Sequence, residues 1–225
     1  MAAGRVLEWD SEFWGVRIAQ VDGPDVEDWA SAHGVACAYL LVPSSEIATA
    51  HRTEDGGFRL MDVRVELEAD AVASGADVRA ARDEDVPTLR TIARTNHADT
   101  RFYADPRFPR DGCDELYDTW IRRSCEGWAD AVFVVDGETA AAGYLSVHRR
   151  DDHGSIGLIG VDSTARGRGL GDALVRGALD WCAAEGLPTC RVVTQGGNVA
   201  AQRVFQRCSF RTRSVDLWFH KWFDE

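Results

Sequence analysis

Two arginines and three glycines lie together in the run Arg166-Gly167-Arg168-Gly169-Leu170-Gly171. Glycine has no Cβ, so the backbone amides of such a run can approach a ligand closely. The run leads directly into an amphipathic segment, and the first turn of a helix carries unpaired N–H groups and a positive dipole. Together these features predict a binding site for a diphosphate group at a helix N-terminus.

The spacing of the glycines narrows the choice of ligand. A dinucleotide fingerprint requires a further glycine three residues after Gly169, and that position is Asp172. A P-loop for ATP requires a lysine followed by serine or threonine, and the only lysine of the chain is Lys221. The pattern that remains is Arg-x-x-Gly-x-Gly, formed by Arg166, Gly169 and Gly171. A glycine turn that merely starts a helix is the alternative, and the preceding strand, the arginine spacing and the apolar helix face disfavour it.

This pattern resembles the acetyl-CoA loop of the GNAT superfamily of N-acetyltransferases. The resemblance covers residues 78–222 and implies acetyl-CoA as the co-substrate, with its pantetheine arm between a strand over 156–161 and a strand over 190–194. It also implies an asparagine at the start of the following helix. The residues that it assigns to acetyl-CoA are Ile159, Val161, Arg166, Gly167, Arg168, Gly169, Leu170, Gly171 and Asn198. A backbone N–H near Gly160 or Val161 would polarise the thioester carbonyl.

A closer resemblance, which extends over the N-terminal part, links the chain to GNAT enzymes that acetylate nucleotide-linked amino sugars. It implies that the acceptor is a primary amine, with such a sugar favoured over other small metabolites. We take Arg101, Phe102 and Tyr103 as the substrate-binding residues, because arginine pairs with phosphate and aromatic rings stack on bases and sugars. A surface arginine beside a packing aromatic is the alternative. The segments that carry the resemblance are Leu7-Glu8-Trp9-Asp10-Ser11-Glu12-Phe13-Trp14-Gly15-Val16, Arg101-Phe102-Tyr103-Ala104, Tyr117-Asp118-Thr119-Trp120-Ile121 and residues 192–198.

One residue departs from the family pattern and leaves the catalytic residues unassigned. The resemblance implies a tyrosine that acts as general acid toward the departing thiolate, and the matching residue is Phe205. Tyr103, Tyr117 and Tyr144 are alternative proton donors, although packing explains each of them equally well. Asp162 is favoured as a turn residue over a catalytic one. Two functions therefore stay open: an N-acetyltransferase, and a catalytically weak or silent acyl-CoA-binding module.

The composition disfavours several other classes of function. The 225 residues include 37 acidic and 25 basic side chains, for a net charge of −12, which disfavours nucleic acid and anionic membranes as partners. No apolar run reaches the roughly 18 residues of a membrane-spanning helix, so we expect a cytoplasmic protein. The six cysteines form no C-x-x-C pair, so we expect reduced thiols and no metal. The sequence leaves open whether the protein forms a homodimer.

The elements that must position the loop predict a mixed α/β (α+β) fold with a central mixed sheet flanked by helices, and the resemblance implies that this is the GNAT fold. Asp136-Gly137 between two apolar runs indicates a β-hairpin. Residues 97–111 are aromatic, rich in arginine and broken by prolines, which is typical of a loop that lines a site. The expected strands are 78–81, 131–135, 139–147, 156–161, 190–194 and two closing strands within 211–222, and the expected helices are 83–96, 112–126, 169–184 and 198–208.

A smaller, degenerate α/β unit is expected before this fold. Its predicted strands cover 17–21, 36–42 and 58–67, and its helices 24–33 and 44–52. Residues 69–77 are small and include Gly75, so they are the best candidate for a linker. We therefore predict two domains, a small N-terminal α/β domain over 1–75 and a GNAT acetyltransferase domain over 76–225.

Overall fold

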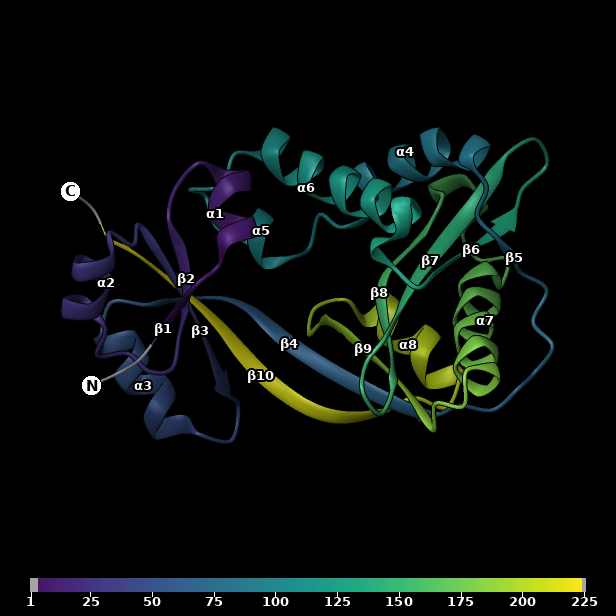
Figure 1. Ribbon diagram of the computed structural model, residues 1–225. Coiled ribbons are helices and arrows are strands. Elements are labelled where there is room, and N and C mark those ends of the chain that lie inside the picture. The colour runs from purple at the N-terminus through teal and green to yellow at the C-terminus, as the bar shows by residue number, and fades with distance from the viewer. Residues whose placement is uncertain (1–3, 224–225) are drawn as a thin grey trace. The chain divides into compact units, whose positions relative to one another are not determined.

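A computed structural model describes residues 4–223 (Figure 1). Its contacts divide the chain into two compact units, each built from separated stretches. Unit 1 contains the residues up to 64, together with 99–112 and those from 214 onward, and unit 2 contains 65–98 and 113–213. The predicted domains are contiguous, whereas these units are not, because residues 99–112 and the last strand join the N-terminal elements. The domain boundary at 75/76 stays a prediction.

Unit 1 is a small sheet with helices, in the strand order β1-β2-β3-β10. Strands β1 and β2 are antiparallel, β2 and β3 are parallel, and β10 is antiparallel to β3 from Asp216 to Trp222. The elements of this unit are β1 (Gly4–Val6), α1 (Glu8–Trp14), β2 (Ile18–Val21), α2 (Glu27–His33), β3 (Cys37–Pro43), α3 (Ile47–Asp55), α5 (Arg101–Ala104) and parts of β4 (Arg59–Asp70) and β10 (Arg211–Trp222).

The core of unit 1 lies around β3. Five of the six residues from Cys37 to Val42 are buried, which is typical of a strand covered on both faces. Side chains from the neighbouring elements complete this core, and its buried members are Val21, Val26, Ala38, Leu40, Val42, Ala50, Phe58 and Phe219.

Unit 2 has the strand order β4-β9-β8-β7-β6-β5. Strands β5 to β8 form an antiparallel series, and β9 is parallel to β8. Its elements are β5 (Arg79–Ala80), a short 3₁₀ turn (Asp83–Asp85), α4 (Val86–Asn96), most of α6 (Arg110–Arg123), a π-helical turn (Ser124–Trp128), β6 (Ala131–Asp136), β7 (Ala141–Arg149), β8 (Gly154–Val161), a 3₁₀ turn (Ser163–Ala165), α7 (Leu170–Ala184), β9 (Thr189–Gln195) and α8 (Val199–Arg207).

Helices α4 and α7 pack on β7 and β8 from opposite faces of this sheet. A Cβ at Gly160 would meet Tyr144 and Ile92 of α4 at 2.8 and 3.1 Å, whereas one at Gly154 would meet the sulfur of Cys182 of α7. Both glycines are therefore needed for the close approach of the helices to β8.

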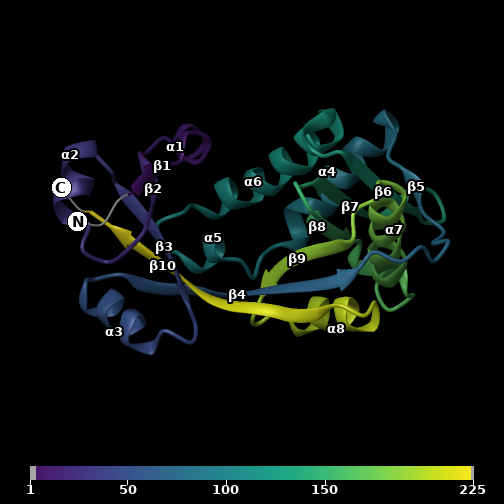
Figure 2. The same cartoon turned by 60° about the horizontal axis from the view of Figure 1, so that its bottom comes forward.

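Strands β8 and β9 separate along their length. They pair only between Gly154–Ile156 and Cys190–Val192, although β8 continues to Val161 and β9 continues to Gln195. Figure 2 shows the two strands diverging beyond their paired ends. The backbone edges in the unpaired half are left open toward each other.

One expectation about the closing strands is wrong. Residues 211–222 form a single strand, β10, and not two, because neither glycine nor proline interrupts the run. Within the predicted linker, which stays a prediction, the backbone N–H groups of Ser74 and Ala76 donate to the carboxylate of Asp180 on α7, the latter at 2.7 Å.

Candidate active site

The loop before α7 has the backbone conformation that its glycines predict. Gly167 and Gly169 lie in the left-handed region, with φ of 78° and 79°, which favours glycine. Gly169 is the N-cap of α7 and no side chain caps the helix there. The first N–H groups of this 15-residue helix therefore remain available for an anionic group.

Arg166 is attached to the end of α4. Its guanidinium donates to the side-chain oxygen of Asn96 at 2.9 Å and to the backbone oxygen of Val161 at 3.4 Å. Asn96 in turn donates to the backbone oxygen of Ile92 at 2.8 Å. Arg168 is exposed on the same loop. Sequence reasoning missed Asn96, because its partner lies 70 residues away.

Apolar side chains are exposed on β9 and at the start of α8. Val193 on β9 is 44% exposed, and Val199 at the start of α8 is 51% exposed. Asn198 is the N-cap of α8, since its side-chain oxygen accepts from the backbone N–H of Ala201 at 3.0 Å. The sequence predicted an asparagine at this helix start.

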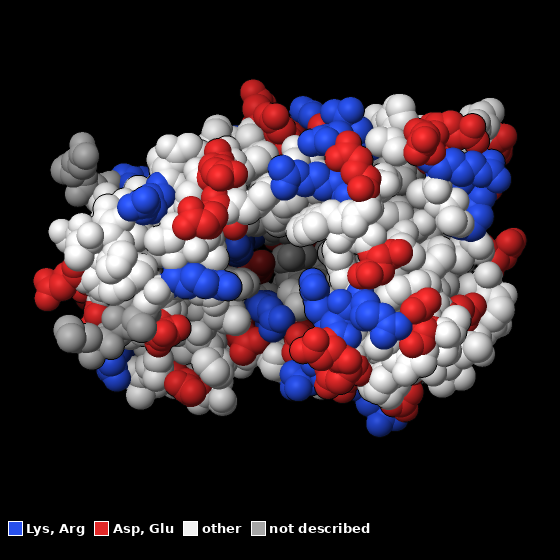
Figure 3. Space-filling view, in the orientation of Figure 1, with Lys and Arg blue, Asp and Glu red and all other residues white. Residues whose placement is uncertain are grey.

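Nearby acidic groups are already paired within unit 2. Asp172, in the first turn of α7, accepts two hydrogen bonds from Arg207 at 2.6 and 2.9 Å, and this arginine lowers the pKa of the carboxyl. Asp162 accepts from the side chain and backbone N–H of Thr164, which lower its pKa. Asp162 thus lies in a turn, the role that the sequence favoured. On the face seen in Figure 3, acidic and basic side chains are interspersed.

At the position on α8 where the resemblance implies a tyrosine, the chain has Phe205, whose side chain cannot donate a proton. Phe205 is 1% exposed and packs against Phe210, with ring centroids 5.7 Å apart. Across the sheet, the Tyr144 hydroxyl lies 3.2 Å from Nε2 of His97, whose ring stacks on Tyr117 at 4.3 Å. Burial lowers the pKa of His97 to about 4 and raises that of Tyr144, so both groups are neutral at pH 7.

The three predicted substrate-binding residues lie in unit 1, at α5. Phe102 is 3% exposed and stacks on Trp14, with centroids 5.9 Å apart. Arg101 and Tyr103 are partly exposed. The guanidinium of Arg110 lies 6.0 Å from the centre of the Tyr103 ring.

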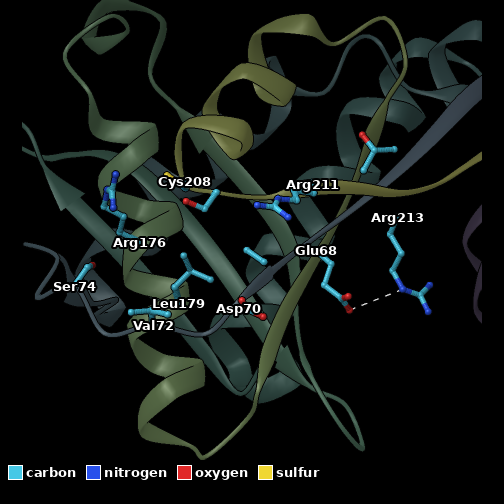
Figure 4. A pocket seen from close by; sticks show the side chains of 12 residues that line it. Glu68, Asp70, Val72, Ser74, Arg176, Leu179, Cys208, Arg211 and Arg213 are labelled. Atoms are coloured by element: carbon cyan, nitrogen blue, oxygen red, sulfur yellow. Dashed lines mark ion pairs between the residues drawn. The ribbon is translucent and has the colours of Figure 1, made fainter.

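A separate cavity of about 680 Å³ lies in unit 2, and Figure 4 shows its lining. Its walls come from the end of β4, from α7, from the turn after α8 and from the start of β10. Arg213 forms an ion pair with Glu68 across part of it, at 3.9 Å. None of the residues that the sequence assigned to acetyl-CoA lines this cavity.

Residues 4–223 hold no cluster of three His, Cys, Asp or Glu side chains suited to a metal ion. The six cysteines are free thiols, and all but Cys125 are buried. No helix in the described part of the chain is long and apolar enough to cross a membrane.

The family model of the acetyltransferase (GNAT) family matches residues 92–210, which is more than half of the chain. The chain therefore belongs to the GNAT family and is an acetyl-CoA-dependent N-acetyltransferase. A solved structure, a GCN5-related N-acetyltransferase from Sphaerobacter thermophilus, has the same fold. It superposes with a TM-score of 0.62 at 15% identity and covers 98% of this chain and 76% of its own. The family and the fold class predicted from the sequence are confirmed.

Among proteins of known function, the chain is similar to the dTDP-fucosamine acetyltransferase of Escherichia coli O6:H1. The two are 28% identical over 224 residues, which is 96% of each chain. The spore coat polysaccharide biosynthesis protein SpsD of Bacillus subtilis is 25% identical over 61% of this chain. This chain spans about half of SpsD, 48% of its length.

Proposed function

We propose that residues 166–171 and the first turn of α7 bind the diphosphate of acetyl-CoA. The observation that carries this proposal is Gly169, which opens a 15-residue helix in the left-handed conformation and leaves its N-terminal amides uncapped. The charge of Arg166 adds to the positive end of the helix dipole, and Asn96 holds its guanidinium against the loop.

The pantetheine arm then lies between the separated halves of β8 and β9. Ile159 and Val161 on β8 and Val193 on β9 supply apolar surface, and the unpaired backbone edges supply hydrogen-bonding groups. Acetyl-CoA supplies an acetyl thioester there. Because Phe205 cannot donate a proton, we propose that α8 provides no general acid and that solvent fills this role.

The acceptor that we propose is the primary amine of a nucleotide-linked amino sugar. Similarity to the dTDP-fucosamine acetyltransferase over nearly the whole chain supports this class of acceptor.

A matched pair of variants tests the cofactor site: Gly169→Glu and Gly186→Glu. Both glycines have a left-handed backbone with no atom near the position of a Cβ, so the two changes introduce the same strain and the same charge at opposite ends of α7.

We expect Gly169→Glu to weaken the binding of CoA at least about tenfold in calorimetry, because its carboxylate repels the diphosphate. Gly186→Glu should bind CoA like the parent protein. Equal affinities of the two variants for CoA would contradict the proposed diphosphate site.

The acceptor is tested by thiol release from acetyl-CoA with dTDP-4-amino-4,6-dideoxygalactose, with the free amino sugar and with a simple alkyl amine. Tight binding of CoA without turnover of any amine would favour an acyl-CoA-binding module.

A further inference from the structure

The guanidinium of Arg101 is held in unit 1 by aromatic rings. It lies 4.1 Å from the ring centre of Tyr39, 4.2 Å from that of Phe102 and 4.7 Å from that of Trp218. One of its nitrogens also lies 2.9 Å from Nε2 of His220. Aromatic faces attract a cation and fix its plane, but they bring no negative charge.

A buried chain of hydrogen bonds fixes the imidazole that Arg101 contacts. Because a guanidinium only donates, Nε2 of His220 must accept, and Nδ1–H then donates to the carboxylate of Asp105 at 2.7 Å. The indole of Trp222 donates to the same oxygen at 2.9 Å. His220 and Asp105 are each 1% exposed, and burial lowers the pKa of His220 to about 4, so the imidazole is neutral at pH 7.

The charge of Arg101 lacks a direct counterion within unit 1. Among the described residues of this unit, no carboxylate forms an ion pair with its guanidinium, in contrast to Arg64, which pairs with Asp216 at 2.9 Å. The carboxylate of Asp62 accepts a hydrogen bond from the backbone N–H of Arg101, and Asp10 and Asp62 both interact electrostatically with the charge of Arg101. A partly buried guanidinium without an anion is costly, unless a ligand supplies the anion.

We propose that Arg101 is the anchor for a phosphate group of the acceptor, and that His220 and Asp105 position it. This inference rests on the proposed function and names the part of the acceptor that Arg101 would bind, which is a phosphate group. A planar guanidinium offers two parallel N–H donors, which match two oxygens of one phosphate group. Arg101 is partly exposed, and the rings and His220 hold the plane of its guanidinium.

The surrounding groups predict how this site responds to pH. Burial raises the pKa of Asp10 and raises that of Asp62 to about 6, so Asp62 loses its negative charge as the pH falls from 8 to 5.5. His220 stays neutral over this range and Asp105, whose pKa is lowered, stays ionised. The buried thiol and phenol of Cys37 and Tyr39 remain protonated. An anion of constant charge, such as sulfate, should therefore bind more tightly at pH 5.5 than at pH 8.

The probe for the experiment is thymidine 5′-diphosphate, titrated by calorimetry at fixed salt. Saturating CoA is present throughout, so that the diphosphate site at α7 is filled. We expect Arg101→Gln to weaken binding at least about tenfold and Arg101→Lys to weaken it less, since a lysine keeps the charge but loses the paired donors. Arg107→Gln is the matched control, because it removes an equal charge from the same segment, where Arg107 lies over Trp222 at 5.1 Å. It should change the affinity less than about twofold.

The positioning role is tested with Asp105→Asn, which keeps the size of the side chain and allows the imidazole to reverse its donor and acceptor nitrogens. We expect KM for a nucleotide-linked amine to rise about threefold to tenfold, with KM for a simple alkyl amine unchanged. A purely structural effect would raise both values.

Unaltered affinity of Arg101→Gln for thymidine 5′-diphosphate would overturn the proposal. So would binding of succinate as tight as that of the nucleotide, which would identify a carboxylate site. These binding measurements require no turnover. The acetyl-CoA proposal is tested separately, by the affinities of Gly169→Glu and Gly186→Glu for CoA. A failure of that proposal can therefore be distinguished from a failure of the Arg101 site.

Discussion

Replacing Asp62 by asparagine should stabilise the protein at neutral pH. Burial raises the pKa of this carboxyl from 3.8 to about 6, and the backbone N–H groups of Val63 and Arg101, together with the charge of Arg101, offset only part of the effect. Each tenfold change in proton affinity corresponds to about 1.4 kcal/mol, so the ionised carboxylate costs at most about 3 kcal/mol. Since Asp62 keeps some exposure to solvent, we expect about 1–2 kcal/mol.

The sign of the pH dependence follows from the direction of the shift. The folded state holds its proton more tightly than the unfolded state, so Asp62 lowers stability as the pH rises from about 4 to about 6 and keeps it lowered above that. The advantage of Asp62→Asn, measured by urea denaturation, should thus be full at pH 7.5 and nearly absent at pH 4. Other carboxylates titrate equally in both proteins and cancel in the difference.

The exposed Asp22→Asn serves as the control for this measurement, and we expect it to change the free energy of unfolding by less than about 0.5 kcal/mol. An advantage of Asp62→Asn that stays constant from pH 4 to pH 7.5 would refute the reasoning, because it would arise from packing rather than from ionisation. So would a loss of stability at both pH values.

Three further changes have definite expected outcomes. Gly160→Ala places a Cβ 2.8 Å from Tyr144 and should cost about 1–3 kcal/mol in urea denaturation, and a neutral effect would show that β8 can move away from α4. Asp118→Ala removes the buried partner of Arg90, which donates at 2.7 and 2.9 Å, and should cost about 1–3 kcal/mol in thermal unfolding; an unchanged Tm would contradict this. Gly169→Ala should cost about 1 kcal/mol through its φ of 79° alone, and a gain in stability would exclude the left-handed conformation.

Local sequence signals predicted the elements of unit 2 well. The helix expected over 169–184 is α7, Leu170–Ala184, because its apolar face and its glycine boundaries are encoded within the segment itself. The Asp136-Gly137 hairpin is present between β6 and β7. In contrast, the helix α1 was not predicted. Its seven residues carry no regular apolar period, and it is held by Ser11, whose hydroxyl accepts from the N–H of Ile18 at 2.9 Å.

The same distinction between local and long-range features applies to the candidate site. The glycines that open α7 could be read from the sequence, because their role depends on their own backbone. The pairing of Arg166 with Asn96, and that of Arg101 with His220, could not, because the partners are 70 and 119 residues apart. Segment 97–111 was expected to be a loop, and the structure places the short helix α5 within it. With 4 residues, α5 is too short to show a helical period of apolar residues in the sequence.

The partition of β10 between the two units has a consequence for synthesis and for fragments. In unit 1, β3 finds its antiparallel neighbour only in residues 216–222. Those residues are synthesised long after β3, so this sheet cannot close before they have left the ribosome. A recombinant fragment ending near residue 75 would expose one edge of β3 and should aggregate, whereas fusing residues 214–225 to it through a flexible loop would restore the missing partner.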